Sequence, residues 1–376
     1  NYAGNFDDDQ LEWAMGYAHD RGRKVYVTVN IQAMDRDIEG VEKSLITLGK
    51  LGPDAVIVAD PGVFDIARKN VPNLPLHLST QTSVTNTAAA EFWFRQGIER
   101  IIVARELSVE QLAVLSNQTS GMIETFIHGA VCVAYSGRCF MSLYWAGKGG
   151  KRRDARHGEC AQSCRWPYRV GLEDLYRPGE DNYMEEDERG TYFFDARDLC
   201  SIPVFDRLLA TGVGSLKIEG RTRSEHYIGV TVDVYRYARD LILGGDLETF
   251  DRKKEALVDE LSMPTNRGFS THFLEGNEPP SETYNSQGSY RGRRNDYAGK
   301  VTENNANYIK IGLKNPLRTG EVLEIRDPGM KSRMIKVDQI LDEDGAVLDF
   351  GRPGVTIRLP GKFSSSPGAL ARKLEP

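Results

Sequence analysis

Short apolar runs alternate with amphipathic stretches from the start of the chain to about residue 280. The runs are rich in β-branched and aromatic residues, which is typical of buried strands, whereas residues 8–21, 40–51 and 88–96 have helical spacing. Strands that alternate with helices in this way predict an α/β fold with a parallel sheet. The predicted strands are residues 25–29, 55–59, 74–78, 101–104, 125–127, 192–194 and 215–218.

Polar residues stand at the ends of several of these runs, as Asp60, His128 and Glu219 do. In a β/α barrel, the loops at the carboxyl ends of the strands build the active site, so these side chains are expected to face a substrate. We therefore predict a TIM-barrel-like (β/α) N-terminal domain. A doubly wound sheet also places polar residues at strand ends and is the alternative fold.

The pattern changes near residue 280, where Pro279 and Pro280 precede a polar, glycine-containing stretch over residues 285–294 that is typical of a linker. Beyond it, apolar and polar residues alternate without a helical segment, which predicts a small C-terminal β-barrel. We expect a β/α-barrel-like domain over residues 1–284 and the β-barrel domain over residues 285–376. Its predicted strands are residues 297–301, 307–313, 321–325, 334–340 and 354–359.

The composition is that of an ordinary soluble protein, with 40% hydrophobic and 27% charged residues and a net charge of -6. No apolar run has the length that spans a bilayer, so we expect a cytoplasmic protein without a membrane partner. Because the chain is acidic overall, a nucleic-acid partner requires a local basic surface. One segment interleaves basic with aromatic residues, a pattern that suits unpaired RNA, although a solvated loop is the alternative. This basic–aromatic segment comprises Tyr144, Trp145, Lys148, Lys151, Arg152, Arg153, Arg156, Arg165, Trp166, Tyr168 and Arg169.

All five cysteines lie between residues 132 and 200. The odd count in a large chain argues against a disulfide framework and leaves thiolates available for a metal. Structural zinc favours tighter pairs than Cys132 with Cys139 or Cys160 with Cys164, so the spacing favours an iron-sulfur cluster over zinc. Unrelated buried cysteines are the alternative without chemistry.

The six histidines are scattered and form no HExxH pattern, which argues against a zinc metalloprotease. A cysteine protease requires a thiolate beside a base, for which His128 or His157 is available. Peptidase activity therefore stays open as an alternative.

Several ordered blocks of residues resemble the collagenase-like peptidase U32 family. The resemblance covers nearly the whole chain, and the C-terminal β-module resembles that of the branch whose members hydroxylate tRNA. The chain begins at a segment that the family reaches after its first strand, so the opening strand of the barrel is expected to be missing. The blocks are Glu124, Phe126, His128, Gly129, Cys132, Tyr135, Ser136, Gly137, Arg138, Cys139 and Ser142; Gly158, Cys160, Cys164, Arg165, Trp166 and Tyr168; Asp198 to Cys200; Leu216 to Arg221; and Asn266 to Phe269.

The resemblance implies an oxygen-independent hydroxylase with a 4Fe-4S cluster on four cysteines. In the tRNA branch, the wobble uridine becomes 5-hydroxyuridine, with prephenate or a related donor as the source of the hydroxyl. The cysteines that match the likely cluster ligands are Cys132, Cys139, Cys160 and Cys200. Cys164 matches a position that some relatives use instead, so it is the alternative ligand. The alternative substrate is ribosomal RNA.

Four basic residues are the candidates for substrate binding. Guanidinium groups bind carboxylates in a bidentate manner, so Arg105, Lys217 and Arg221 are candidates for a small dicarboxylate donor such as prephenate. The alternative for them is a salt bridge to Glu106 or Glu219. Arg267 is a candidate for a phosphate contact.

Two further residues are candidates for catalysis. His128 lies four residues before Cys132, where it can donate to a cluster sulfur or move a proton, or where it is a hydrogen-bonded structural histidine. Glu219 is the other candidate.

Overall fold

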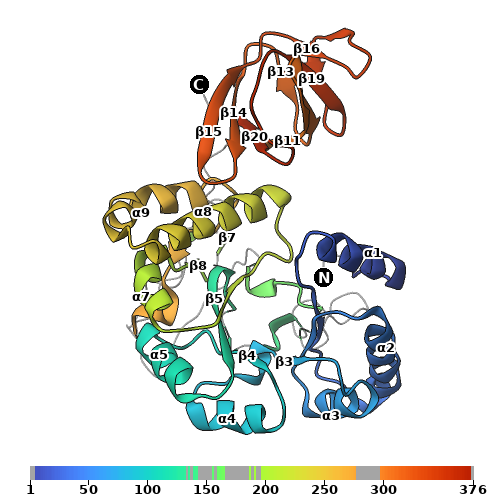
Figure 1. Ribbon diagram of the computed structural model, residues 1–376, viewed down its shortest axis with the longest axis vertical. Coiled ribbons are helices and arrows are strands. Elements are labelled where there is room, and N and C mark those ends of the chain that lie inside the picture. The colour runs from blue at the N-terminus through green and yellow to red at the C-terminus, as the bar shows by residue number, and fades with distance from the viewer. Residues whose placement is uncertain are drawn as a thin grey trace. The chain divides into compact units, whose positions relative to one another are not determined.

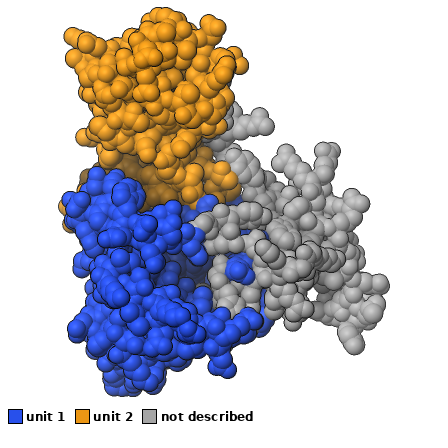
Figure 2. Space-filling view, turned by 90° about the vertical axis from the view of Figure 1, so that its right-hand side faces the viewer, with its two compact units in different colours: residues 1–222, 267–289 blue, residues 223–266, 290–376 orange. Residues whose placement is uncertain are grey.

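The computed structural model describes residues 5–132, 134–135, 139–142, 155, 159–165, 186–187, 190–191, 196–276 and 297–373. They fall into two compact units, coloured in Figure 2: residues 1–222 with 267–289, and residues 223–266 with 290–376. The expected boundary between residues 284 and 285 lies outside the described residues, so those domain limits stay a prediction. Among the residues just given, no helix has both the length and the apolar character needed to cross a membrane.

The first unit is built on a sheet whose first five strands are parallel and follow chain order. The helices that connect them surround the strands (Figure 1). This arrangement confirms the α/β class and the parallel sheet. The strands are β1 (Tyr26–Val29), β2 (Ala55–Val58), β3 (Leu76–Leu78), β4 (Arg100–Ile102) and β5 (Met122–Ala130), and the helices are α1 (Asp8–His19), α2 (Ile38–Leu51), α3 (Pro61–Asn70), α4 (Thr87–Arg95), α5 (Val109–Gln118) and α7 (Phe205–Ala210).

Local sequence explains these elements. All four residues of β2 are buried and apolar, as expected for a strand that is covered on both faces. Helix α2 buries Val41, Leu45 and Leu48, which share one face at helical spacing. Helix α3 begins at a proline, and the Asp60 carboxylate before it accepts hydrogen bonds from two main-chain N–H groups of the first turn.

Strand β5 changes partners along its length. Its first half pairs in parallel with β4, and β9 (Ser215–Ile218) runs parallel to it over Glu124 to His128. Its last three residues pair antiparallel with β8 (Asp198–Cys200), so that Cys200 lies opposite His128. Strand β10 (Phe269–Ser270) adds to β8 in parallel.

The pairing does not join β1 to β9 within the described residues. A closed TIM barrel and a missing opening strand therefore both stay predictions. The predicted strand over residues 192–194 lies outside the described residues, as does most of the chain around the short hairpin of β6 (Glu186–Asp187) and β7 (Gly190–Thr191).

The second unit contains the helices α8 (Glu225–Leu243) and α9 (Leu247–Leu261) and an all-antiparallel β domain. The main sheet has the order β15-β14-β20-β11-β12-β19-β16-β17, and β13 pairs with β18. This confirms a separate antiparallel β domain at the C-terminal end, while closure into a barrel stays a prediction. The strands are β11 (Tyr297–Asn304), β12 (Tyr308–Leu313), β13 (Leu317–Arg318), β14 (Val322–Asp327), β15 (Lys331–Lys336), β16 (Ile340–Leu341), β17 (Val347–Leu348), β18 (Phe350–Gly351), β19 (Thr356–Pro360) and β20 (Leu370–Lys373).

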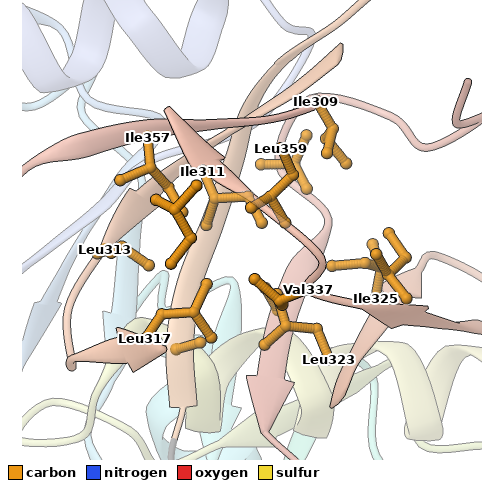
Figure 3. Packing of buried hydrophobic residues seen from close by; sticks show 14 of the residues in the cluster. Ile309, Ile311, Leu313, Leu317, Leu323, Ile325, Val337, Ile357 and Leu359 are labelled. Carbon is orange, nitrogen blue, oxygen red and sulfur yellow. The ribbon is translucent and has the colours of Figure 1, made fainter. Parts of the chain in front are cut away.

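The β domain has its own core of aliphatic side chains, which point toward one another from facing strands in Figure 3. Alternation explains it, since Ile309, Ile311 and Leu313 of β12 are buried while the residues between them are less so. Within the same unit, Glu260 of α9 accepts from both Nη atoms of Arg372 at 2.8 and 3.0 Å. This bidentate ion pair fastens α9 to β20.

Candidate functional site

The carboxyl ends of β5 and β9 meet at a glycine. The main-chain N–H of Glu219 donates to the carbonyl oxygen of His128 at 2.9 Å. Gly129 has a φ of 105°, and a β-carbon at this position would lie 2.3 Å from the carbonyl oxygen of Glu219. Only glycine allows this approach, which sets Glu219 against the end of β5.

Arg105 follows β4 at the same edge of the sheet. Its Nη1 donates to the carbonyl oxygen of Ala130 at 2.9 Å, and its guanidinium carbon lies 3.9 Å from the ring centre of Phe126. Burial lowers the pKa of the guanidinium, and the negative charges of Glu219 and Cys132 act against that shift. Arg105 forms no ion pair with any described residue, and its Nε is buried without a partner. The Arg105 guanidinium is thus held by the carbonyl of Ala130 and the ring of Phe126, and it is within electrostatic reach of Glu219 and Cys132.

His128 lies deeper, on β5. Its side chain is fully buried, and its ring centre lies 5.4 Å from that of Phe269 on β10. Cys200, opposite it in the register, is also buried. The structure therefore brings His128 and one predicted ligand together through strand pairing.

The remaining four cysteines lie in the segments that follow β5. Cys132 and Cys160 are exposed, and Cys139 and Cys164 are partly buried. All five cysteines are within the described residues, and none forms a disulfide. Each thiol is therefore chemically available as a ligand.

Two of these thiols are in contact. The Cys139 thiol hydrogen-bonds with Cys132, and this bond, together with burial and the charge of Cys164, raises the pKa of Cys139. Three predicted or alternative ligands thus lie within electrostatic reach of one another. Mutually close thiolates repel, and a bound cation offsets that repulsion.

Cys160 has different surroundings. Its sulfur accepts a hydrogen bond from the Gln162 N–H at 3.3 Å and lies 3.6 Å from the Ser142 hydroxyl. The same hydroxyl accepts from the Ala161 N–H at 2.9 Å, which orders the turn. Such donors are typical of the surroundings of a thiolate ligand.

The donor chemistry of these cysteines fits an iron-sulfur cluster, because all are soft thiols without a disulfide and Cys139 interacts with both Cys132 and Cys164. The described residues present no group of three or more Cys, His, Asp or Glu side chains arranged as a finished metal site. The assignment of individual ligands therefore stays a prediction.

Lys217 has an ion-pair partner within the sheet. Its Nζ lies 3.2 Å from Oε1 of Glu124 on β5, and among the described residues it forms no ion pair with Glu106 or Glu219. Glu124 Oε2 also accepts from Arg100 Nη1 at 3.0 Å and from Ser215 Oγ at 2.8 Å. Burial opposes ionisation of Glu124, but these partners outweigh it and lower its pKa.

This charged group extends across the sheet to β1 and β3. Arg100 Nη2 donates to the Tyr26 hydroxyl at 3.3 Å, and the Tyr26 ring packs edge-on against His77 at 4.8 Å. Sequence reasoning missed Arg100, His77 and Tyr26 as site residues. The available signal was a charged or polar residue at alternate positions within runs that are otherwise apolar.

The other two basic candidates also have partners. Arg221 Nη2 donates to Asn5 Oδ1 at 3.1 Å, and its N–H donates to Glu219 Oε1 at 3.0 Å. Arg267 is buried and forms an ion pair with Asp198 of β8, which is also buried. Arg267 is therefore paired with the strand that carries Cys200, and phosphate binding by it stays a prediction.

The basic–aromatic segment cannot be placed at this site, because its side chains lie outside the described residues. Ser136, Gly137, Arg138 and Gly158 lie outside them as well. RNA binding by that segment stays a prediction.

Comparison with known proteins shows the family of the chain. The sequence model described as Peptidase family U32 matches residues 1–283, and the Peptidase family U32 C-terminal domain matches residues 293–372. The chain belongs to peptidase family U32. This confirms the family that the residue blocks indicated.

Three curated relatives show where in family U32 the similarity lies. The chain is 35% identical to "tRNA hydroxylation protein P1" of Bacillus subtilis, over 93% of this chain and 81% of the relative. It is 33% identical to "tRNA hydroxylation protein P" of Escherichia coli, over 86% and 78%. It is 29% identical to "23S rRNA 5-hydroxycytidine C2501 synthase" of Escherichia coli, over 82% and 45%.

Proposed function

We propose that this chain is an RNA-modifying enzyme that hydroxylates tRNA, converting the wobble uridine to 5-hydroxyuridine without molecular oxygen. One observation carries the proposal: the similarity to proteins named for tRNA hydroxylation extends over both family U32 regions and over most of each relative. A site built for the reaction must combine a redox-competent group, a donor-binding cation and a proton-transfer residue.

The cluster is proposed to lie on Cys132, Cys139, Cys160 and Cys200, with Cys164 as the alternative to Cys160. When bound, a 4Fe-4S cluster supplies electron transfer or a Lewis-acidic iron. Strand pairing fixes Cys200 opposite His128, and the Cys139–Cys132 contact holds two further thiols together. These features support a thiolate site at the end of β5.

The overall exchange balances if the donor carries a carbon-bound hydroxyl. The C5–H bond of uridine and the donor C–OH bond break, and a C5–OH bond and a donor C–H bond form. The base is thereby oxidised by two electrons and the donor is reduced by two. Prephenate or a related hydroxylated dicarboxylate is the proposed donor class.

Arg105 and Lys217 are proposed to hold the donor. Arg105 is within electrostatic reach of Cys132 and forms no ion pair with a described residue, so a ligand carboxylate can pair with it. Lys217 and Arg100 share the single carboxylate of Glu124, which leaves one excess positive charge in that group. Glu219 and His128 are the proposed proton-transfer residues, and Arg221 positions Glu219 through its N–H bond.

The alternatives are a peptidase, in the sense of the family name, and hydroxylation of ribosomal RNA. The relative named for 23S rRNA modification is matched over 45% of its length, whereas the two relatives named for tRNA hydroxylation are matched over 81% and 78%. The longer matches favour tRNA as the substrate.

Nucleoside mass spectrometry of bulk tRNA tests the proposal. The gene is expressed in a strain that lacks its own tRNA hydroxylases, beside a Cys139→Ser variant as the control. Hydroxyuridine is expected with the wild-type protein and not with the variant. Its absence with soluble, iron-loaded wild-type protein overturns the proposal, and parallel analysis of ribosomal RNA then tests the alternative substrate.

A further inference from the structure

A groove of about 570 Å³ lies on the β domain between β15 and the segment that follows β19. One wall carries Arg333, Met334 and Lys336, and the other carries Lys362 and Phe363. Its volume is within the range of ligand-binding clefts. The groove is contained in the second unit and involves none of the cysteines.

The charge of the groove is positive in a chain whose net charge is -6. Three of its residues are basic and one, Asp338, is acidic. Neither Lys336 nor Lys362 forms an ion pair with a residue that the structure describes. Both lysines are exposed, so their charges are available to a ligand.

Arg333 connects the two walls. It donates to the Ser364 hydroxyl and lies 3.3 Å from Oδ2 of Asp327, which is nearly buried. Its Nε is buried without a partner. Arg333 and the two exposed lysines all line the groove, and arginine and lysine are the residues that most often contact phosphates.

Apolar side chains complete the surface. Phe363 packs partly against the β-domain core, and Met334 is 59% exposed at the edge of the groove. Side chains with an apolar or aromatic surface among lysines give bases a place to pack while the lysines neutralise the backbone. The positive charge of the groove, next to apolar side chains, therefore favours RNA as its ligand.

We propose that this groove is an RNA-docking surface that binds the sugar–phosphate backbone of the substrate through Lys336, Lys362 and Arg333. The inference rests on the proposed function for the identity of the RNA, because tRNA is the substrate proposed for the cysteine site. Docking through a separate surface provides affinity without base readout, since phosphate contacts position an RNA but carry no sequence information.

Lysines on an edge strand also have a protective role. Strand β15 is at the edge of its sheet, and charged side chains there prevent edge-to-edge pairing between molecules. Lys336 satisfies this description, but Lys362 does not, because it follows β19 and lies on the opposite wall. The two roles make different predictions for RNA binding.

The test compares tRNA binding, by fluorescence anisotropy at several salt concentrations, for the wild type and for Lys336→Gln/Lys362→Gln. The control is Lys314→Gln/Arg352→Gln, which removes the same charge. Both control residues lie at the end of the β12–β19 pair that is away from the groove. Docking predicts about tenfold weaker binding and a log–log salt slope reduced by about 1.5, since each phosphate contact contributes roughly 0.7 to 0.9. The control is expected to bind as the wild type does.

Unchanged affinity and slope in the groove variant overturn the proposal, and self-association of that variant then assigns the lysines to edge protection. An equal loss in the control also overturns it, because the effect is then one of net charge. Lys336→Arg/Lys362→Arg keeps both charges and is expected to bind as the wild type does. An unchanged urea-unfolding midpoint of the glutamine variant excludes misfolding as the cause. Binding is measured without turnover, so a wild type that binds through the groove but makes no hydroxyuridine contradicts the proposed function alone.

Discussion

The carbonyl oxygen of Glu219 lies 2.3 Å from the place where a β-carbon on residue 129 would be. The glycine at this position thus lets β9 close against the end of β5. Arg105 donates to the carbonyl oxygen of Ala130 at the same strand end, so a proposed proton-transfer residue and a proposed donor-binding cation both lie there. The arrangement depends on main-chain geometry as well as on charged groups.

Gly129→Ala is therefore expected to destabilise the first unit. The β-carbon meets a main-chain oxygen that cannot rotate away, and φ is 105°. The expected loss of unfolding free energy is about 2–4 kcal/mol, from strain and displaced backbone.

Urea unfolding measures this loss. Gly16→Ala is the control, because nothing lies within 4 Å of a β-carbon there. In helix α1 that control is expected to be neutral or to stabilise by up to about 1 kcal/mol. Equal midpoints for the two variants would contradict the close contact.

Glu124→Gln tests the charged group inside the sheet. The substitution leaves Arg100 and Lys217 without their shared carboxylate. Breaking a buried pair costs about 3–5 kcal/mol, and because Lys217 is partly exposed we expect about 2–4 kcal/mol at pH 7. The matched control is Glu39→Gln, whose partner Lys43 is exposed, with an expected effect of roughly 0.5 kcal/mol or less.

The same variant has a defined pH dependence. The pKa of Glu124 is lowered in the folded protein from a value of 4.5, so its contribution is fully present above that pH and is lost as pH falls through the folded pKa. The stability difference between wild type and Glu124→Gln is therefore expected to be constant near neutrality and to shrink below about pH 4.5. A difference that grows on acidification would show that Glu124 is not ionised in the folded state.

Apolar runs that alternate with helical segments were sufficient to predict the parallel strands, because the pattern is local. Strand β2, in which all four residues are buried, is the clearest example. The pairing of Cys200 with His128 was not predictable in this way. Strand β8 has three residues, and its partner lies far back in the chain, so no periodicity marks it. Similarly, Glu124 and Ser215 are 91 residues apart, and only the register of β5 with β9 brings them together.

The buried histidines predict that the fold loses stability in acid at pH values above those at which carboxylates are protonated. Burial lowers the pKa of His77, His226 and His272 to about 4 from 6.5. Since the unfolded chain then binds protons more readily, stability is expected to fall as pH decreases from 6.5 to about 4, by about 3 kcal/mol for each histidine. His226→Gln is expected to reduce that slope, measured by calorimetry across this window. An unchanged slope would mean that His226 is already protonated in the folded state.

The cysteine assignment predicts an unequal effect of single substitutions. Cys139→Ser is expected to abolish cluster binding, because Cys139 contacts Cys132 and both are proposed ligands. Cys200→Ser, on β8, is expected to do the same. Cys164→Ser is the matched control, since it removes a thiol from the same segment while leaving the four proposed ligands. Iron and acid-labile sulfide in anaerobically purified protein are the readouts.

Retained iron in Cys139→Ser contradicts the assignment. Loss of iron in Cys164→Ser together with retention in Cys160→Ser would show that Cys164 is the ligand in place of Cys160. Cys164 is a reasonable alternative because its charge acts on Cys139 in the folded chain.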